Sequence, residues 1–100
     1  MYHCQILTRD EIIFVYNSYM KKDFPEDELK PLSMIINALD KGQYFCYGIF
    51  KDDKLCGYAY FVSVVINSMK YCLLDYFAVL QRVHIKKRAS KIIASMITEI

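Results

Sequence analysis

The last third of this chain places a cluster of cations directly after an apolar strand. Residues 71–80 are almost entirely apolar, and residues 82–91 contain five cations and no acid. The cations are Arg82, Lys86, Lys87, Arg88 and Lys91. A strand, a turn and a helix with a basic first turn often bind the phosphates of a nucleotide-like cofactor, because free helix amides and cations both attract anions. The spacing therefore predicts an anion-binding turn after residue 80.

Asp75 is the one carboxylate of the 71–80 strand. In a regular strand it shares a face with Phe77 and Val79, where a carboxylate could take part in acid–base chemistry. The alternative is a structural role, in which Asp75 bonds helix or loop amides on the sheet face. Three tyrosines of the predicted strands also have a functional and a structural interpretation, because they could line an acceptor pocket but more often pack in a core. They are Tyr58, Tyr60 and Tyr76.

The composition indicates one small folded domain. The chain has 100 residues, of which 55% are hydrophobic and 24% charged, with three glycines and two prolines. This is enough apolar sequence for a core and argues against disorder. No apolar run approaches the roughly 18–20 residues of a membrane span, and residues 1–5 lack the basic start of a signal peptide. We therefore expect a cytoplasmic protein without membrane contacts.

The cysteines and histidines do not form a recognisable metal site. The cysteines share no Cys-x-x-Cys spacing, and neither His3 nor His84 has a second ligand at helical or hairpin spacing. Without signs of secretion, reduced core thiols are favoured over disulfides or zinc. The thiols are Cys4, Cys46, Cys56 and Cys72.

Local signals predict the N-terminal elements. A weak apolar alternation over 2–7 predicts an edge strand. Thr8 and Glu11 match a capping box, Thr-x-x-Glu, in which the two side chains satisfy free amides at the start of a helix. Apolar residues at helical spacing then predict a helix over 9–22, which Pro25 ends.

The remaining elements follow from turn residues and apolar patterns. Pro31 fits the first turn of a second helix and Gly42 its C-terminal cap. Three strands are then predicted over 43–51, 54–65 and 70–80, joined by short turns, and an apolar stripe predicts a last helix from about Ile85. The expected fold class is α+β, with the order β-α-α-β-β-β-α and a mainly antiparallel sheet flanked by helices. We expect residues 1–100 to form a single domain.

Within this order of elements, three segments resemble the GNAT superfamily of acetyl-CoA-dependent N-acetyltransferases, especially small bacterial members of the acetyltransferase-domain type. They are the joint Phe-Pro-Glu-Asp-Glu-Leu-Lys-Pro-Leu over 24–32, the hairpin over 48–61 and the strand over 74–80. The hairpin contains Leu-x-Gly-Tyr-Ala and the strand ends in Phe-Ala-Val-Leu, a specific combination when both occur in this order. The resemblance covers residues 1–80 well and 81–100 only by register.

The resemblance implies acetyl-CoA as the cofactor. In the family, main-chain groups matching Phe77 to Leu80 pair with the pantetheine arm like an added strand. The next turn carries Arg/Gln-x-x-Gly-x-Gly/Ala, whose glycines let the backbone approach the diphosphate. Counting on from Val79 places this motif on His84 to Ala89. The implied cofactor-binding residues are Phe77, Ala78, Val79, Leu80, His84, Lys86, Lys87, Arg88, Ala89 and Ser90.

Two departures from the family pattern concern the C-terminal part. Lys87 stands at the first motif glycine, where a positive φ would cost about 1 kcal/mol, although neighbouring cations offset part of the loss. Family members also continue with a strand that forms the other wall of the cofactor cleft and with a region that often supplies a tyrosine as the acid. We therefore expect a C-terminally truncated member, and the hypothesis of a frameshift after Leu80 is tested by the DNA downstream of codon 100.

The implied reaction is direct transfer of an acetyl group from the thioester to a primary amine of a small molecule or protein. A carboxylate removes the proton of the amine, and Asp75 is the candidate for this role. A main-chain N–H near Val79 or Leu80 polarises the thioester carbonyl. The acidic loop over 23–28 lies where relatives often shape acceptor specificity, and it would suit a cationic amine.

Two other functions stay open. A non-catalytic GNAT remnant could act as a protein-interaction module, because an exposed edge on residues 71–80 can pair with another chain, including a second copy in a homodimer. The cations of 82–91 could bind nucleic acid, but no aromatic or amide side chains lie among them, so only nonspecific binding is expected. Binding of acetyl-CoA, self-association and salt-dependent binding to duplex DNA distinguish the three functions.

Overall fold

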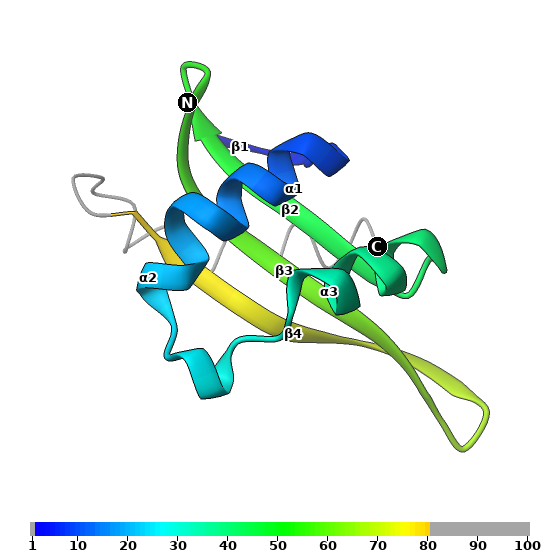
Figure 1. The fold of residues 1–100 in the computed structure, drawn as a ribbon. Coiled ribbons are helices and arrows are strands. Elements are labelled where there is room, and N and C mark those ends of the chain that lie inside the picture. Colours follow the sequence, from blue (N-terminus) through cyan, green and yellow to red (C-terminus); the bar gives the residue numbers. More distant parts are fainter. Residues whose placement is uncertain (1, 81–100) are drawn as a thin grey trace.

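Four antiparallel strands form one sheet, and the helices lie against one of its faces (Figure 1). A computed structural model describes residues 2–80 of the chain. Each strand pairs with the next along the chain, so β4 is an edge strand within the described residues. The strands are β1 (Tyr2–Ile6), β2 (Tyr44–Lys51), β3 (Lys54–Ile66) and β4 (Met69–Val79).

The helical stretch after β1 consists of three consecutive pieces, α1 (Arg9–Val15), the π-helical turn η1 (Tyr16–Met20) and α2 (Lys21–Asp23). The predicted capping box is confirmed. The Glu11 N–H donates to Thr8 Oγ1 at 3.2 Å, and the Thr8 N–H donates to Glu11 Oε1 at 2.8 Å. The helix predicted over 9–22 is thus confirmed, except that the apolar spacing gave no sign of the π turn.

A short joint leads to the second helix. It contains the 3₁₀ turn η2 (Glu26–Glu28) and is followed by α3 (Leu32–Asp40). Pro31 occupies the N-cap of α3 rather than its first turn. At the other end, Gly42 has a φ of +70° and its N–H donates to the Leu39 carbonyl at 3.0 Å, so the predicted glycine cap is confirmed.

Both predicted hairpin turns are confirmed. The first has Asp52 and Asp53 at φ values of 49° and 66°, and the second has Asn67 and Ser68 at 50° and 66°. Two consecutive residues with positive φ are typical of the two-residue turns that match the twist of antiparallel strands. Aspartate and asparagine tolerate this conformation better than most residues with a side chain.

The core between helices and sheet is rich in tyrosine. Its main members are Ile12, Val15, Met20, Ile35, Tyr44, Cys46, Tyr58, Tyr60 and Tyr76. The opposite face of the sheet also holds fully buried side chains, those of Ile49, Ala59 and Phe61. The predicted α+β class and the order β-α-α-β-β-β are confirmed for residues 2–80, whereas the helix predicted from Ile85 lies outside the described residues.

Candidate functional site

A β-bulge at Asp75 divides β4 into two halves. Tyr60 pairs with Tyr76 while the next residue of β3, Phe61, pairs with Leu74, so Asp75 is left without a partner in the ladder. The extra residue reverses the alternation of side chains beyond it. The predicted shared face of Asp75, Phe77 and Val79 is therefore wrong.

Contacts on the two faces of the sheet show this reversal. Asp75 accepts a hydrogen bond from the hydroxyl of Tyr44, which belongs to the core beneath the helices, and Tyr76 packs in that same core. Phe77 and Val79 instead pack against Ile49 and Cys56 on the other face. Two consecutive side chains, those of Asp75 and Tyr76, thus point toward the helices.

Asp75 holds a lysine from the joint before α3. The Lys30 ammonium lies 2.7 Å from Asp75 Oδ2, and the Tyr44 hydroxyl donates to the same oxygen. The Asp75 side chain is 19% exposed and that of Lys30 36%, so the pair lies at the rim of the core. Burial, followed by the hydrogen bond to Asp75, raises the pKa of Tyr44 above its ordinary value. The phenol therefore stays a hydrogen-bond donor throughout the physiological pH range.

Two tyrosines fix the backbone of the same joint. The Tyr76 hydroxyl accepts from the Lys30 N–H at 2.8 Å and donates to the Glu28 carbonyl at 3.1 Å. The Tyr16 hydroxyl donates to the Lys30 carbonyl at 2.7 Å. Lys30 is thus held through its side chain and both main-chain groups. Sequence reasoning missed Lys30, because no local pattern links it to a strand so distant in sequence.

The three candidate pocket tyrosines are core residues. Tyr58 and Tyr60 are fully buried and Tyr76 is 6% exposed. The Tyr58 hydroxyl donates to Asp23 Oδ2 at 2.7 Å, whereas the buried Tyr60 hydroxyl has no hydrogen-bond partner among the described residues. The packing role, which the sequence favoured, is therefore the one the structure gives them.

Beyond the bulge, the outer edge of β4 presents main-chain groups in a defined pattern. The Leu80 N–H donates to the Cys56 carbonyl at 2.9 Å, so it points toward β3. Main-chain direction alternates along an antiparallel strand, and the N–H and C=O of Phe77 and Val79 therefore point away from β3. No strand within residues 2–80 pairs with this edge. Of the two amides expected to polarise a carbonyl, Val79 faces outward and Leu80 is already engaged.

Gly57 allows β3 and β4 to approach closely at this end. A Cβ atom on Gly57 would lie 2.6 Å from the Ala78 carbonyl oxygen, which is shorter than any stable contact. The glycine of the Leu-x-Gly-Tyr-Ala motif thus has a physical role, since it keeps Ala78 and its neighbours in register opposite β3.

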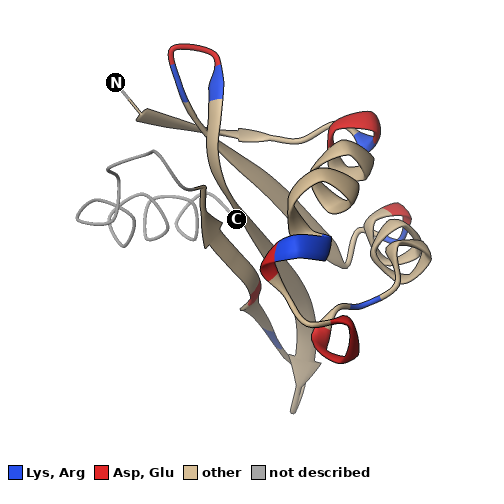
Figure 2. Ribbon diagram, turned by 60° about the vertical axis from the view of Figure 1, so that its left-hand side comes forward, with Lys and Arg blue, Asp and Glu red and all other residues tan. Residues whose placement is uncertain are grey.

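A hollow of about 560 Å³ lies on the helix side of the joint. Its lining is mostly apolar and aromatic, with one cation and one acid, and consists of Tyr16, Lys21, Phe24, Glu26, Leu29 and Pro31. The Phe24 ring meets the Tyr76 ring edge-on with centroids 4.9 Å apart, so one wall of the hollow rests on β4 beside the bulge. The acidic turn η2 flanks this region (Figure 2).

The predicted anion-binding turn cannot be placed. His84, Lys86, Lys87, Arg88, Ala89 and Ser90 lie outside the described residues. Within residues 2–80, no cluster of metal-ligating side chains is present, and no helix is long and apolar enough to cross a membrane.

Two solved structures share this fold. One is a predicted acetyltransferase from Clostridium acetobutylicum, solved with acetyl-CoA, with a TM-score of 0.73 and 9% identity over 99% of this chain and 73% of that chain. The other is a GNAT family acetyltransferase from Staphylococcus aureus, with a TM-score of 0.63 and 12% identity over 95% of this chain and 74% of that chain. No protein-family model and no curated protein matches the chain. The chain has a GNAT-type fold, as the resemblance implied.

Proposed function

We propose that this chain is an acetyl-CoA-dependent N-acetyltransferase of the GNAT type, which acetylates a primary amine. The observation that carries the proposal is the outer edge of β4 beyond its bulge, which no strand of residues 2–80 pairs with and where Phe77 and Val79 direct main-chain groups away from the sheet. It occurs in a fold shared with acetyltransferases, one of which was solved with acetyl-CoA.

The residues of this edge fit an extended, amide-containing ligand. Pantetheine carries two amides, and the outward N–H and C=O of Phe77 and the outward C=O of Val79 can pair with them as a neighbouring strand would. Ala78 and Leu80 pack against the core beneath the helices, so they hold the strand in place and leave pairing to the other two residues. When bound, acetyl-CoA supplies a thioester that is reactive toward amines.

The N–H of Val79 is the proposed donor to the thioester carbonyl. It is the last outward-pointing amide of β4, and a preorganised amide stabilises the charge that develops on such an oxygen during attack. The turn residues His84, Lys86, Lys87, Arg88, Ala89 and Ser90, three of them cationic, are proposed to hold the diphosphate, from the sequence pattern alone. Cations and free amides at that position would both attract it.

The acceptor amine is proposed to enter from the helix side, through the hollow beside Phe24. The hollow contacts β4 through the Phe24–Tyr76 pair, and Tyr76 directly precedes Phe77 on the proposed donor edge. Glu26 lines the hollow, and the next two residues are also acidic. These three acids outnumber Lys21, the one cation of the lining, and a net negative charge beside an apolar hollow suits an ammonium group carried on an apolar body.

Asp75 stays the proposed acceptor of the amine proton, because it is the one carboxylate of β4. Its contacts with Lys30 and Tyr44 give it a second task, which is to fix the joint that lines the hollow. The two tasks predict different consequences for variants of Asp75 and Lys30.

The full chain tests the proposal directly. Titration calorimetry with acetyl-CoA is expected to show saturable binding, and release of free coenzyme A is expected to rise when primary amines are added. Absence of binding at millimolar acetyl-CoA would remove catalysis by this chain. It would leave the alternative of a non-catalytic module, which the apolar end of the β3–β4 hairpin favours.

A further inference from the structure

The β3–β4 hairpin extends past the rest of the sheet as an arm, residues 64–74 (Figure 1). β2 begins at Tyr44, which pairs with Val62, and the Ser63 N–H donates to the Gln43 carbonyl at 2.8 Å. Beyond Ser63, β3 pairs with β4 alone among the described strands. The outer part of the arm, residues 64–71, is thus a two-stranded ribbon, which is marginally stable without further packing.

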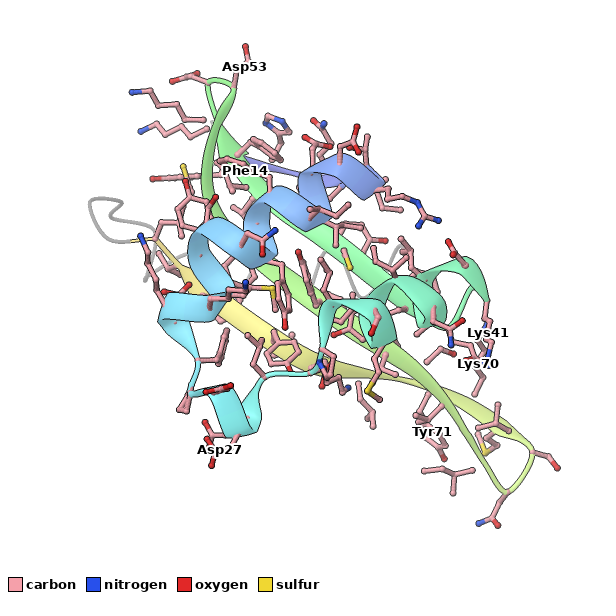
Figure 3. All side chains as sticks on the ribbon, viewed as in Figure 1. Phe14, Asp27, Lys41, Asp53, Lys70 and Tyr71 are labelled. Carbon is pink, nitrogen blue, oxygen red and sulfur yellow. The ribbon has the colours of Figure 1, made fainter. Side chains whose placement is uncertain are left out.

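Large apolar side chains of the arm are exposed to solvent. The exposed fractions range from 42% for Tyr71 to 70% for Val65, and Tyr71 lies on the arm beyond α1 and α2 (Figure 3). No charged residue occurs between Lys54 and Lys70, so the turn end of the hairpin is uncharged (Figure 2). The exposed set is Val65, Ile66, Met69, Tyr71, Leu73 and Leu74. Large apolar side chains that are exposed together on one arm mark an interface more often than a free surface.

Among the described residues, the outer edge of the arm pairs with no other strand, and the register shows which of its main-chain groups point outward. The two-residue turn makes Ile66 and Met69 the first hydrogen-bonded pair, so the main-chain groups of Lys70, Cys72 and Leu74 point outward from β4. Ser63 lies opposite Cys72, and its N–H points toward β2. This direction is the one expected if the main-chain groups of Cys72 point away from β3. The regular edge ends at the Asp75 bulge.

We propose that the arm pairs with the arm of a second copy of the chain, β4 against β4 in antiparallel orientation, about a two-fold axis at Cys72. In this register Cys72 faces Cys72 of the second copy, and Tyr71 faces Leu73. Lys70 faces Leu74, so the single charge of the arm does not oppose itself. Cross-strand apolar pairs stabilise such an arrangement, and like charges directly opposite each other would destabilise it.

A second copy fits this edge for two reasons. A strand that pairs antiparallel with itself about a two-fold axis offers the same outward groups to the same outward groups, so the interface is self-complementary. The arm is also almost free of charge, which is the composition of homodimer interfaces rather than of transient ones. The paired segment, residues 70–74, ends before the proposed donor edge at Phe77, so the inference does not rest on the proposed function.

Charge substitutions at Leu74 test the register. Leu74→Lys places a cation opposite Lys70 of the second copy, whereas the matched Leu74→Glu removes the same apolar side chain but places an anion there. Sedimentation velocity over a concentration series is expected to show a dimer for the wild type. We expect at least about tenfold weaker dimerisation for Leu74→Lys than for Leu74→Glu. The double variant Lys70→Glu/Leu74→Lys is expected to restore the dimer.

Cys72 gives an independent test of the axis. Directly opposed residues in a hydrogen-bonded pair have Cα atoms about 5.5 Å apart, which is within the range that a disulfide spans. Mild oxidation of the wild type is expected to give a reducible covalent dimer, which Cys72→Ser abolishes and Cys4→Ser retains. Circular dichroism confirms that each variant is folded. A wild type that is monomeric at all concentrations, or a dimer indifferent to the Leu74 charge and to Cys72, would overturn the proposal.

Discussion

The Lys30 ammonium contacts Asp75 Oδ2 at 2.7 Å, although the two residues are 45 positions apart in the chain. Asp75 is the extra residue of the β4 bulge, and Lys30 lies in the joint just before α3. The contact therefore ties the joint, which lines the proposed acceptor hollow, to the strand that carries the proposed donor edge. A change in either residue should therefore lower the stability of the fold.

Asp75→Asn keeps the shape of the side chain and removes its charge. The Tyr44 hydroxyl retains an oxygen acceptor, but the Lys30 ammonium loses its ion pair. Because Lys30 is partly exposed, we expect a loss of about 1–2 kcal/mol in the free energy of unfolding, measured by urea denaturation. Lys30→Met should cost a similar amount, and the double variant should cost little more, because both changes remove one interaction.

The same two variants separate a proton acceptor from a positioning residue. Lys30→Met leaves the carboxylate of Asp75 in place, whereas Asp75→Asn removes it. If Asp75 takes the amine proton, turnover falls strongly in Asp75→Asn and is largely retained in Lys30→Met. Equal losses in the two variants would contradict the proton-acceptor role and leave the structural one.

Tyr58 and Tyr60 provide a matched pair on one face of β3. Both side chains are fully buried, but the Tyr58 hydroxyl bonds Asp23 and the Tyr60 hydroxyl has no partner among the described residues. Tyr58→Phe is expected to lower the free energy of unfolding by about 1 kcal/mol, because it removes a hydrogen bond. Tyr60→Phe is expected to leave it unchanged or raise it by up to about 1 kcal/mol, because burying an unpaired hydroxyl is unfavourable. Urea denaturation of both variants at neutral pH tests this ordering, and the reverse order would contradict it.

The free energy of unfolding should fall more steeply with rising alkaline pH than it does for a protein whose tyrosines are exposed. Burial is the main cause that raises the pKa of Tyr44, Tyr58 and Tyr60 above the ordinary value near 10. At high pH the unfolded chain releases these protons while the folded chain retains them. The free energy of unfolding is therefore expected to hold below pH 10 and to fall as the pH rises above about 10.

The slope of this decline is measured by urea denaturation at a series of alkaline pH values. Tyr60→Phe removes one of the retained protons, so its slope is expected to be shallower than that of the wild type. A slope that does not change in this variant would show that Tyr60 ionises equally in the folded and unfolded chains.

Gly57→Ala should harm the fold more than Gly48→Ala. A Cβ at Gly57 would meet the Ala78 carbonyl oxygen at 2.6 Å, and this backbone atom cannot move without disturbing β4. A Cβ at Gly48 would meet side-chain ends, Phe50 Cε2 at 2.6 Å and Leu7 Cδ2 at 2.7 Å, which can rotate away. We expect about 1–3 kcal/mol of destabilisation for Gly57→Ala and less for Gly48→Ala, measured by thermal unfolding. We also expect Gly57→Ala to weaken acetyl-CoA binding and Gly48→Ala to leave it unchanged.

Local chemistry in the sequence predicted most of the elements. The Thr8–Glu11 capping box and the two hairpin turns depend on residues within a few positions of each other, so their patterns are readable without the fold. The bulge was not predictable in the same way. The strand around Asp75 is apolar on both faces, so its side-chain pattern does not reveal where the alternation reverses.

The contacts of the candidate site residues were also not predictable from the sequence. Lys30 and Asp75 meet only because the joint folds back over β4, and neither residue has a neighbour in sequence that marks the contact. The direction of the main-chain groups at Phe77 and Val79 likewise depends on the register with β3. The family resemblance pointed to β4, but only the pairing with β3 shows which of its main-chain groups point away from β3.

Val79→Pro tests the central claim most directly, which is that the outer edge of β4 binds acetyl-CoA through its main chain. Proline removes an N–H that points away from β3, so the ladder bond of Leu80 to Cys56 can stay intact. Lys70→Pro is the matched control, because it removes an outward N–H of the same strand on the other side of the bulge. Calorimetry should show about tenfold weaker acetyl-CoA binding for Val79→Pro and wild-type binding for Lys70→Pro, with both variants folded. Wild-type affinity in a folded Val79→Pro variant would contradict the claim.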